Sequence, residues 1–442
     1  MLLLSPMVLL STMYNNSRAD SLVNPQDLPV IEMQHAERLL VIAPHPDDET
    51  LGAGGAIQAA LARGMQVRVI VFTNGDGQPI APFLIEKQLV PNSRAFVRSG
   101  QVRQQESINA LRLLGVPTED VYFLGFPDRQ MGQLWLADWR NQCPLRSEFT
   151  RTIQVPYPEV YAPGALNCGS TVLQIVKDLL NDYRPDLILL PHLSDDHPDH
   201  RAASQFTLMA VAEMAAQDPA YSPSILGYVI HFGKYPRIRG WHLRNSLLPP
   251  IPLVSQEEVW ERLDLTPDQE QVKAQAIRAY TSQLRMMKSF LEGFARQDEI
   301  FQRVELLEFP MSWFGAVEIN QVEDLELAKT GEAVKESTRR MVLPGTDLTE
   351  LQVSILGNRL QVSAGARGPL IPDLQYRIYF KFTDGTTKTC ALTHDGVRLD
   401  ASTYACTLDI AELQMPAVVG FQAEVSKVVA LDRSGWHFLV LR

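Results

Sequence analysis

The architecture of this chain follows from Leu39-Leu-Val-Ile-Ala43, an unbroken apolar run that ends in Pro44-His45-Pro46-Asp47-Asp48-Glu49. An apolar run of this length is typical of a parallel strand covered on both faces of its sheet. The residues from Gly52 to Arg63 predict a helix, with Gly64 as its stop. A second strand is expected from Gln66 to Phe72. The first forty residues after position 36 therefore predict a strand–helix–strand unit.

The same alternation continues along the chain. The expected elements are a helix from Gly100 to Leu114, a strand from Val121 to Leu124, a helix from Thr171 to Tyr183 and a strand from Asp186 to Pro191. Such spacing predicts an α/β fold with a doubly wound, mostly parallel, Rossmann-like sheet. Two insertions, near residues 78–98 and 129–167, leave the carboxyl ends of the second and third strands. Open α/β sheets bind their ligands at that rim.

The pattern changes after about residue 320. Residues 321–340 are charged and indicate a linker, whereas from Leu351 onward apolar residues alternate with polar ones between turn dipeptides such as Gly357-Asn358 and Asp384-Gly385. This pattern predicts an all-β, sandwich-like domain. We therefore expect an N-terminal extension at 1–36, the α/β domain at 37–320, a linker at 321–346 and the β domain at 347–442.

Composition excludes several classes of protein. The 442 residues exceed the ~250–300 at which one core usually stops growing, so more than one domain is expected. A formal charge of −11 argues against a nucleic-acid partner, which would require a basic face. No apolar run reaches the ~18 residues of a transmembrane helix. The sequence does not indicate an oligomeric state.

The amino end and the cysteines bear on location. Residues 1–10 are apolar and could be the core of a secretory signal within residues 1–19, although no basic residue precedes Arg18; a chance apolar tip is the alternative. The four cysteines form two local pairs, Cys143 with Cys168 and Cys390 with Cys406. Two disulfides or buried thiols would both explain them, and a bridge is favoured for the second pair, which is expected in adjacent strands. We expect a secreted or cell-envelope protein, with a cytoplasmic location as the alternative.

Two clusters of titratable residues carry the chemistry. His45, Asp47 and Asp48 follow the first strand, and Asp195-Asp196-His197-Pro198-Asp199-His200 follows the strand that ends at Pro191. A turn needs one Asp as a helix cap, not a histidine with two carboxylates. Because both clusters leave carboxyl ends of one parallel sheet, we expect them on the same rim. Imidazole and carboxylate together suit zinc or a similar divalent metal, with one position left for water.

The residues alone do not show which side chains bind the metal and which act on the water. Asp47 and Asp48 are adjacent, so their side chains diverge; one could bind the metal while the other reaches the water, and the same division applies to His197 and His200. A metal, its water and an acid/base pair are the parts that an amide hydrolase requires.

These residues resemble the LmbE/PIG-L family of zinc-dependent N-acetylglucosaminyl deacetylases. The resemblance covers about residues 37–318 and is most specific in the two metal motifs. Weaker motifs agree with it, namely Thr73-Asn74-Gly75, Arg103-Gln-Gln-Glu106, Gly125-Phe126-Pro127-Asp128, Tyr280-Thr281-Ser282-Gln283 and Glu299-Ile300-Phe301.

The resemblance implies a role for each matching residue. His45, Asp48 and His200 would bind zinc, and Asp47 would be the general base. His197 would stabilise the oxyanion and protonate the leaving amine, while Asp199 would orient a neighbouring imidazole. Arg103 and Asp128 would contact the sugar. Some relatives place a tyrosine where this chain has Asp195, which leaves a tyrosine role in oxyanion binding without a matching residue.

Other residues have competing interpretations. His231 could reach the pocket to contact substrate or could be a core histidine, and His192 is expected to support a ligand rather than to be one. Arg103 could instead pair with Glu106 on its own helix. Trp135 and Trp139 could stack on a sugar or anchor the second insertion, and Asp76 could be a turn residue. Gly52-Ala-Gly54-Gly55 lacks the rest of a dinucleotide fingerprint, and close helix packing explains it.

The function expected from these residues is removal of the N-acetyl group from an N-acetylglucosamine-type amino sugar or its conjugate through a metal-activated water. Zinc is the expected metal, although iron accepts the same ligands. The β domain would serve for attachment. The alternatives are an amidase on another acylated amine and a carbohydrate-binding protein with a structural metal; the spare carboxylate of Asp47 argues against the latter, because a structural zinc does not need it.

Overall fold

The computed structural model describes residues 25–79, 92–139, 141–254, 259–309, 315–319, 343–428 and 430–442. The expected signal segment at 1–19 and residues 321–342 of the expected linker at 321–346 lie outside these ranges. Within them, no helix has the length and the apolar character that a membrane span requires.

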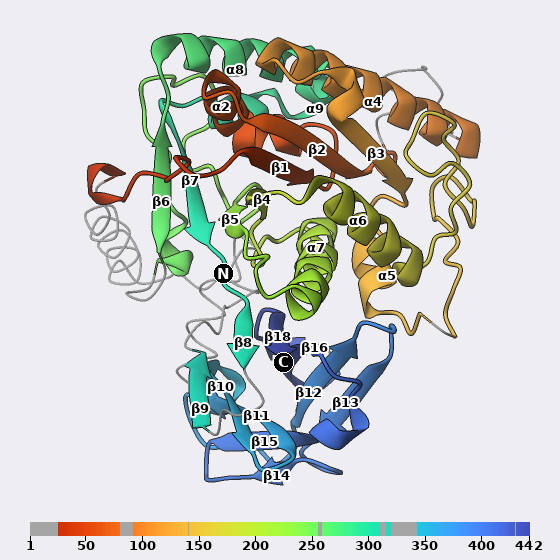
Figure 1. Ribbon diagram of the computed structural model, residues 1–442, viewed down its shortest axis with the longest axis vertical. Helices are drawn as coiled ribbons and strands as arrows, with labels where there is room; N and C mark the ends of the chain where they lie inside the picture. The colour runs from red at the N-terminus through yellow and green to blue at the C-terminus, as the bar shows by residue number, and fades with distance from the viewer. Residues whose placement is uncertain are drawn as a thin grey trace, which may run out of the picture.

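A seven-stranded sheet forms the centre of the larger part of the molecule (Figure 1). Its strand order is β3-β2-β1-β4-β5-β7-β6. The first five strands pair in parallel, and the last two pair antiparallel at one edge. The strands are β1 (Arg38–Ala43), β2 (Gln66–Thr73), β3 (Val121–Phe126), β4 (Leu187–Pro191), β5 (Ser224–Tyr228), β6 (Trp260–Asp264) and β7 (Asp298–Arg303). The expected α/β fold with a mostly parallel sheet is confirmed.

Strand β1 shows why these residues form a buried strand. Its Leu39 and Val41 pack into the hydrophobic core on one face of the sheet, whereas Leu40 and Ile42 pack into the core on the other. Helices cover both faces, so an alternating apolar and polar pattern would bury polar groups, and a continuous apolar run is required. In register, Leu39 lies opposite Val67 of β2 and Leu187 of β4.

The helices divide between the two faces (Figure 1). Residues of α2, α4 and α8 belong to the first core, and residues of α5, α6 and α7 belong to the second. The helices are α2 (Asp48–Ala62), α4 (Ser93–Leu114), α5 (Met131–Leu136), α6 (Gly169–Tyr183), α7 (Pro198–Gln217), α8 (Pro267–Ala279) and α9 (Thr281–Leu291).

Two helices begin earlier than the sequence analysis expected. Helix α2 begins at Asp48 rather than Gly52, which brings Asp48 into the first helical turn. Helix α4 begins at Ser93, inside the expected first insertion, because Asn92 caps it by accepting the backbone N–H of Ala95.

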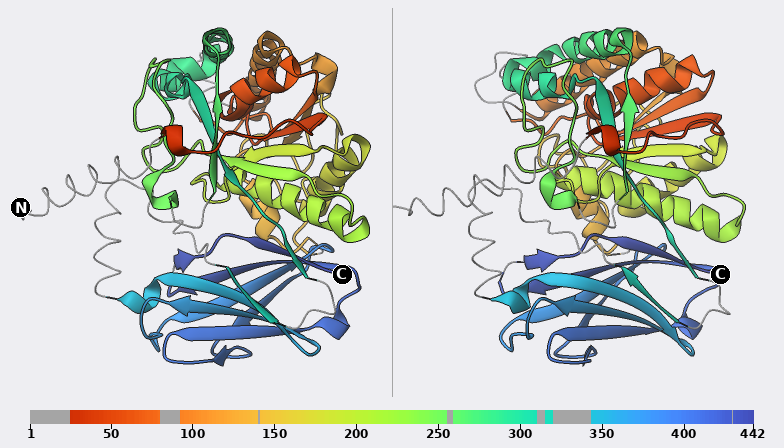
Figure 2. Two further views of the ribbon diagram at one scale, coloured as in Figure 1. Left: turned by 60° about the vertical axis from the view of Figure 1, so that its left-hand side comes forward. Right: turned by 90° about the vertical axis from the view of Figure 1, so that its left-hand side faces the viewer.

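The C-terminal part consists of two sheets (Figure 2). One has the order β14-β15-β11-β10-β9; the other has the order β13-β12-β16-β18-β8, with β17 paired to β16. Residues of both sheets share one hydrophobic core. The strands are β8 (Leu307–Phe309), β9 (Gly315–Ile319), β10 (Leu348–Leu356), β11 (Arg359–Ala366), β12 (Gln375–Phe382), β13 (Thr387–Ala391), β14 (Val397–Arg398), β15 (Thr403–Asp409), β16 (Ala417–Ser426), β17 (Ala430–Arg433) and β18 (His437–Leu441).

Strands β8 and β9 bear on the expected boundary at residue 320. Strand β8 pairs in parallel with β18, and β9 pairs antiparallel with β10. Residues 307–309 and 315–319 therefore lie in the sheets of the C-terminal part, before the expected end of the α/β domain. The other domain boundaries stay predictions.

Both expected cysteine pairs are disulfides. Cys143–Cys168 closes the second insertion onto the start of α6. Cys390 lies in β13 and Cys406 in β15, so this bridge joins the two C-terminal sheets. The expectation that it would join adjacent strands of one sheet is wrong.

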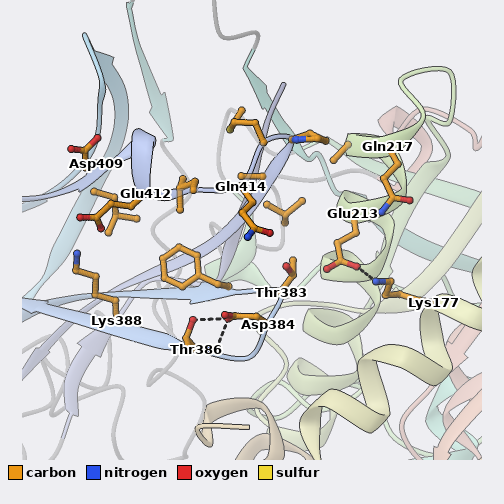
Figure 3. Close-up of a pocket in the computed structure, with 18 residues that line it drawn as sticks. Lys177, Glu213, Gln217, Thr383, Asp384, Thr386, Lys388, Asp409, Glu412 and Gln414 are labelled. Carbon is orange, nitrogen blue, oxygen red and sulfur yellow. Dashed lines mark hydrogen bonds and ion pairs between the residues drawn. The ribbon is translucent and has the colours of Figure 1, made fainter. Parts of the chain in front are cut away.

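A cleft of about 630 Å³ lies between the two parts of the molecule (Figure 3). Lys177 of α6 and Glu213 of α7 form one wall, and Asp384 and Lys388 around the β12–β13 turn form the other. This cleft marks the seam along which the β region meets the helices of the α/β part.

One buried ion pair supports a prediction about stability. The Nζ atom of Lys273 lies 2.6 Å from Oε1 of Glu299 and donates to the carbonyl of Leu51, and both charged side chains are buried. Replacing Lys273 by Met leaves a buried carboxylate without its cation, so we expect the free energy of unfolding to fall by about 3–5 kcal/mol. Denaturant unfolding measures it. Lys288→Met, which removes an exposed partner of Glu292, is the control and should cost less than about 1 kcal/mol; equal losses would contradict this prediction.

Candidate metal centre

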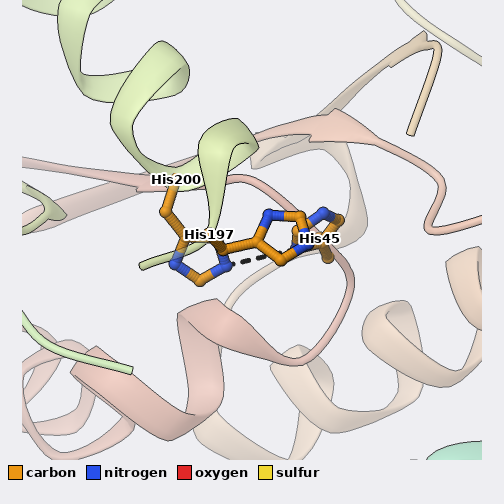
Figure 4. Close-up of side chains that lie close together, drawn as sticks. All are labelled: His45, His197 and His200. Atoms are coloured by element: carbon orange, nitrogen blue, oxygen red, sulfur yellow. Dashed lines mark hydrogen bonds between the residues drawn. The ribbon is translucent and has the colours of Figure 1, made fainter. Parts of the chain in front are cut away.

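The two sequence clusters meet at the carboxyl edge of the central sheet. His45 follows β1, and His200 lies in the first turn of α7, which begins at Pro198 after β4. Strands β1 and β4 are neighbours in the sheet. Nε2 of His200 lies 3.3 Å from Nδ1 of His45, although the two residues are 155 positions apart in sequence. Figure 4 shows these rings together with that of His197.

The three ligands implied by the resemblance form a compact triangle. Oδ2 of Asp48 lies 3.1 Å from Nδ1 of His45 and 3.1 Å from Nε2 of His200. Four ligands at the usual zinc bond lengths, arranged as a tetrahedron, are separated by about 3.3 Å. The separations of these three atoms therefore fit a shared zinc ion. The other close sets among the described residues are His45 with His197 and His200, Asp48 with His200 and His231, and His45 with Asp128 and Asp199.

The electrostatics of the cluster also fit a cation. Burial by itself lowers the pKa of His200, but the carboxylates of Asp195 and Asp48 outweigh burial and raise that pKa to about 9. Burial likewise lowers the pKa of His45. The nearby carboxylate of Asp128 and hydrogen bonds to three carboxylates outweigh burial and raise that pKa well above its usual value. The surrounding carboxylates thus hold positive charge at a buried place where a divalent metal would supply it.

Asp195 supports the ring of His200. Its Oδ2 lies 3.1 Å from Nδ1 of His200, on the side of the ring away from Asp48. The same carboxylate accepts backbone N–H groups of His197 and His231. Such a partner fixes the orientation of a ligand imidazole. The sequence analysis placed Asp195 in the second titratable cluster but gave it no role in supporting His200. Its position two residues before His197 was the available signal.

Asp199 and Asp128 support the ring of His45. Oδ2 of Asp199 lies 3.3 Å and Oδ1 of Asp128 lies 3.1 Å from Nε2 of His45, opposite the nitrogen that faces Asp48. The structure thus places Asp199 beside an imidazole, as expected. Asp128 is buried, and its second oxygen accepts the backbone N–H of Gly77 at 2.7 Å. Asp128 thus contacts His45 and the backbone of Gly77, and its expected contact with sugar hydroxyls stays a prediction.

Asp47 occupies a strained turn. Its φ of 133° is a backbone conformation that L-residues rarely adopt, and it precedes α2 without capping that helix through its side chain. Its N–H donates to Glu49 at 3.0 Å, and its Oδ2 lies 3.3 Å from Nη2 of Arg103. Burial raises the pKa of Asp47 to about 8, against the opposing effect of Arg103. A carboxylate with a pKa near neutrality is suited to proton transfer.

Arg103 reaches the cluster from α4. It donates to the carbonyls of Gly75 at 2.9 Å and Pro46 at 2.8 Å, in addition to its contact with Asp47. The alternative of a pair with Glu106 is wrong, because Glu106 instead accepts the hydroxyl and N–H of Ser282. Arg103 therefore braces the turn that carries Asp47, and its contact with a sugar stays a prediction.

His197 lies beside the predicted ligands. Its ring centroid is 4.7 Å from that of His45, and its Nδ1 accepts the backbone N–H of Asp199 at 3.2 Å. Burial, together with the neighbouring His45 and His200, holds the pKa of His197 well below its usual value. The neutral ring then carries its proton on Nε2, which can donate a hydrogen bond to a developing oxyanion.

His231 and His192 differ in their surroundings. His231 is partly exposed, its ring lies 4.9 Å from that of His200, and it stacks on Phe290, so it belongs to the rim of the site. His192 is fully buried, accepts the N–H of Ser194 and stacks on Trp260. The contacts described for its ring do not include a predicted ligand. The expected support of a ligand by His192 stays a prediction, whereas Asp195 contacts His200 directly.

The sequence analysis gave no role to one further buried carboxylate, Glu49, and interpreted another, Asp76, as a turn residue. Glu49 accepts the hydroxyls of Ser107 and Tyr280 as well as the N–H of Asp47. Asp76, interpreted as a turn residue, is buried and accepts the hydroxyl of Tyr157 at 2.5 Å. Partners this distant in sequence leave no local pattern that could have identified them.

Comparison with known proteins agrees with the motifs. Residues 40–211 match the family described as "PIG-L: GlcNAc-PI de-N-acetylase". A 1D-myo-inositol 2-acetamido-2-deoxy-alpha-D-glucopyranoside deacetylase of Saccharopolyspora erythraea is 29% identical over 184 residues, which are 40% of this chain and 54% of that protein. A protein of the same name from Mycolicibacterium vanbaalenii is 29% identical over 256 residues, which are 56% of this chain and 81% of that protein. The chain spans about half the length of most of the curated relatives it matches.

Two solved structures are also similar. The N,N'-diacetylchitobiose deacetylase from Pyrococcus horikoshii is 20% identical, with a TM-score of 0.38 over 66% of this chain and 92% of that chain. A deacetylase in the biosynthesis pathway of teicoplanin is 18% identical, with a TM-score of 0.39 over 61% of this chain and 99% of that chain.

The contact of Asp195 with His200 leads to a prediction about metal affinity. Asp195→Asn removes the carboxylate that orients His200, so we expect zinc affinity to fall about 10–100-fold. Competition with a chelating dye measures the dissociation constant. Asp196→Asn, at the neighbouring residue, whose side chain accepts the N–H of Gly233, is the matched control and should bind zinc nearly as well as the unaltered protein. Equal affinities of the two variants would exclude the proposed support of His200.

Proposed function

We propose that this chain, whose residues 40–211 match the PIG-L family, is a metal-dependent hydrolase that removes the N-acetyl group from an N-acetylglucosamine-type amino sugar or its conjugate. The observation that carries the proposal is the meeting of His45, Asp48 and His200 directly beside the strained turn of Asp47. A metal with a purely structural role would not need a further buried carboxylate at its edge.

His45, Asp48 and His200 would hold the metal, which we propose to be one zinc ion; iron accepts the same ligand types. The chemistry that zinc supplies when bound is polarisation of the amide carbonyl and a lowered pKa for water. Both histidines have carboxylates behind their second nitrogen, Asp195 for His200 and Asp199 for His45. These contacts would keep the ligand nitrogens turned toward a common point.

Asp47 would act as the general base. Hydrolysis adds the hydroxyl of water to the acetyl carbon and moves its proton to the departing nitrogen, so one group must accept that proton and release it again. The buried carboxyl of Asp47, which Arg103 contacts, would serve for this exchange. Nε2–H of His197 would donate a hydrogen bond to the carbonyl oxygen as negative charge develops. Because this neutral ring has only that proton, the leaving amine would take its proton from Asp47, which received it from water.

The substrate class rests on the relatives. Their printed names describe deacetylation of a 2-acetamido-2-deoxy-glucopyranoside, and we extend that class to this chain as N-acetylated amino sugars or glycoconjugates. His231, at the rim of the site, would contact the sugar, and Arg103 and Asp128 would influence it through the turn and the ring of His45 that they hold.

The two parts of the chain would then divide the work. The α/β part would be a doubly wound, Rossmann-like catalytic domain, and the two C-terminal sheets would form a sandwich-like accessory domain. We propose a secreted or cell-envelope location. Its support is the pair of disulfides, since disulfides persist mainly in oxidising compartments.

A substrate panel tests this function. The zinc-loaded chain would be incubated with N-acetylglucosamine, its oligomers, glycosides and a non-sugar N-acetyl amine, and acetate release would be measured. We expect release from acetylated sugars, its loss after chelation and its return with zinc. Hydrolysis of the non-sugar amide alone would instead identify an amidase on another acylated amine.

The role of Asp47 gives a separate prediction. Asp47→Asn removes the proton acceptor but none of the three predicted ligands, so kcat should fall about 10²–10⁴-fold while zinc is retained. Steady-state acetate release and metal analysis of the same preparation measure the two effects. An equally active Asn variant would remove Asp47 from the mechanism, whereas loss of zinc would indicate that Asp47 is a ligand.

A further inference from the structure

Helix α5 connects the metal centre to the C-terminal β region. At its beginning, Asp199 accepts the backbone N–H groups of Met131 at 3.0 Å and Arg129 at 2.5 Å. The same carboxylate faces Nε2 of His45. The N–H groups at the start of α5 therefore contribute to holding the carboxylate that supports His45.

The other end of α5 is buried against the β region. Trp135, one helical turn after Met131, is 1% exposed. Its ring lies edge-on at 5.4 Å from that of Trp436 and 6.0 Å from that of Phe438. Phe206 of α7 packs against it from the α/β part at 5.1 Å. Trp135 is thus held between the two parts of the molecule, which supports the interpretation of the tryptophans as anchors and not as sugar platforms.

A second contact fixes the segment that follows α5. Lys381 of β12 is buried, and its Nζ donates to the carbonyl of Ala137 at 2.8 Å. The same ammonium lies 4.4 Å from the ring centroid of Trp139, a cation–π arrangement. Gly385 also packs on Trp139, because a Cβ atom there would come within 2.5 Å of that ring. The β region therefore holds both tryptophans of the second insertion.

The β region also completes the core on this face of the central sheet. Trp436, Phe438 and Val440 belong to the same hydrophobic cluster as Leu40 and Ile42 of β1. Without them, the aromatic rings of α5 and α7 would face solvent as an apolar patch. An accessory domain used only for attachment would not need to complete the core that packs against α5 and α7.

We propose that Trp436 and Lys381 are positioning residues for the reaction: from the β region they hold α5, and α5 holds Asp199 against the ring of His45. The inference rests on the proposed function for its effect on catalysis, but not for its effect on metal binding. A shorter side chain at 436 would leave space beside Trp135. Because Trp135 and Met131 are one turn apart on a six-residue helix, a shift at one is transmitted to the other.

The test compares Trp436→Ala, Trp436→Phe and Lys381→Met with Lys388→Met as the matched control. Lys388 is an exposed lysine of the same hairpin and lines the cleft of Figure 3, to which α5 contributes no lining residue. Zinc dissociation constants, kcat, KM and thermal midpoints are measured for each variant. We expect Trp436→Ala and Lys381→Met to weaken zinc binding and to lower kcat about tenfold, with KM little changed. Trp436→Phe should retain most of the zinc affinity and of kcat, and Lys388→Met should leave the zinc affinity and kcat unaltered.

Each variant at 436 is also combined with Asp199→Asn. If the effect passes through Asp199, Trp436→Ala should cause little further loss of zinc affinity in that background. Additive losses in the double variant, or a folded Trp436→Ala protein that binds zinc within about twofold of the unaltered chain, would overturn the proposal. Should Trp436→Ala not fold, Lys381→Met, alone and combined with Asp199→Asn, carries the same comparison. A protein that hydrolyses none of the acetylated sugars refutes the proposed function, while the zinc measurements still decide the coupling.

Discussion

The rest of this structure depends on two imidazoles and one carboxylate that approach within 3.3 Å of one another at the edge of a parallel sheet. His45 and His200 are brought there because the strands that precede them are neighbours and point the same way. Buried carboxylates then lie behind each ring, and carboxylates without nearby positive charge are costly to bury. The site is therefore organised around a cation, and the same carboxylates raise the pKa of both rings.

The turn that carries Asp47 is the second constraint. A residue with φ of 133° persists only where its surroundings over-determine it. Arg103 from α4 and Glu49 from α2 supply that restraint, and Glu49 is itself held by the hydroxyls of Ser107 and Tyr280. Side chains from α2, α4 and the residue before α9 thus meet under one backbone turn. The same contacts keep Asp47 away from helix capping and leave its carboxyl beside the predicted ligands.

The β region is bound to this arrangement more closely than an appended module would be. Its aromatic residues continue the core that begins at β1, and strands β8 and β9 pair with strands of its two sheets. The disulfide between Cys143 and Cys168 closes the insertion that contains α5, while Cys390–Cys406 ties the two C-terminal sheets together. The insertion, the metal centre and the β region therefore form one packed unit.

The sequence by itself determined the parallel sheet and the meeting of the two clusters, because a continuous apolar run and a polar strand end are both local patterns. His45, Asp48 and His200 could be placed on one rim from those patterns and from the family resemblance. Only the tertiary structure decided which groups stand behind them: Asp195 at His200, Asp128 at His45, and Trp436 under α5. Such contacts join residues far apart in the chain, and packing in three dimensions, which no local periodicity records, selects them.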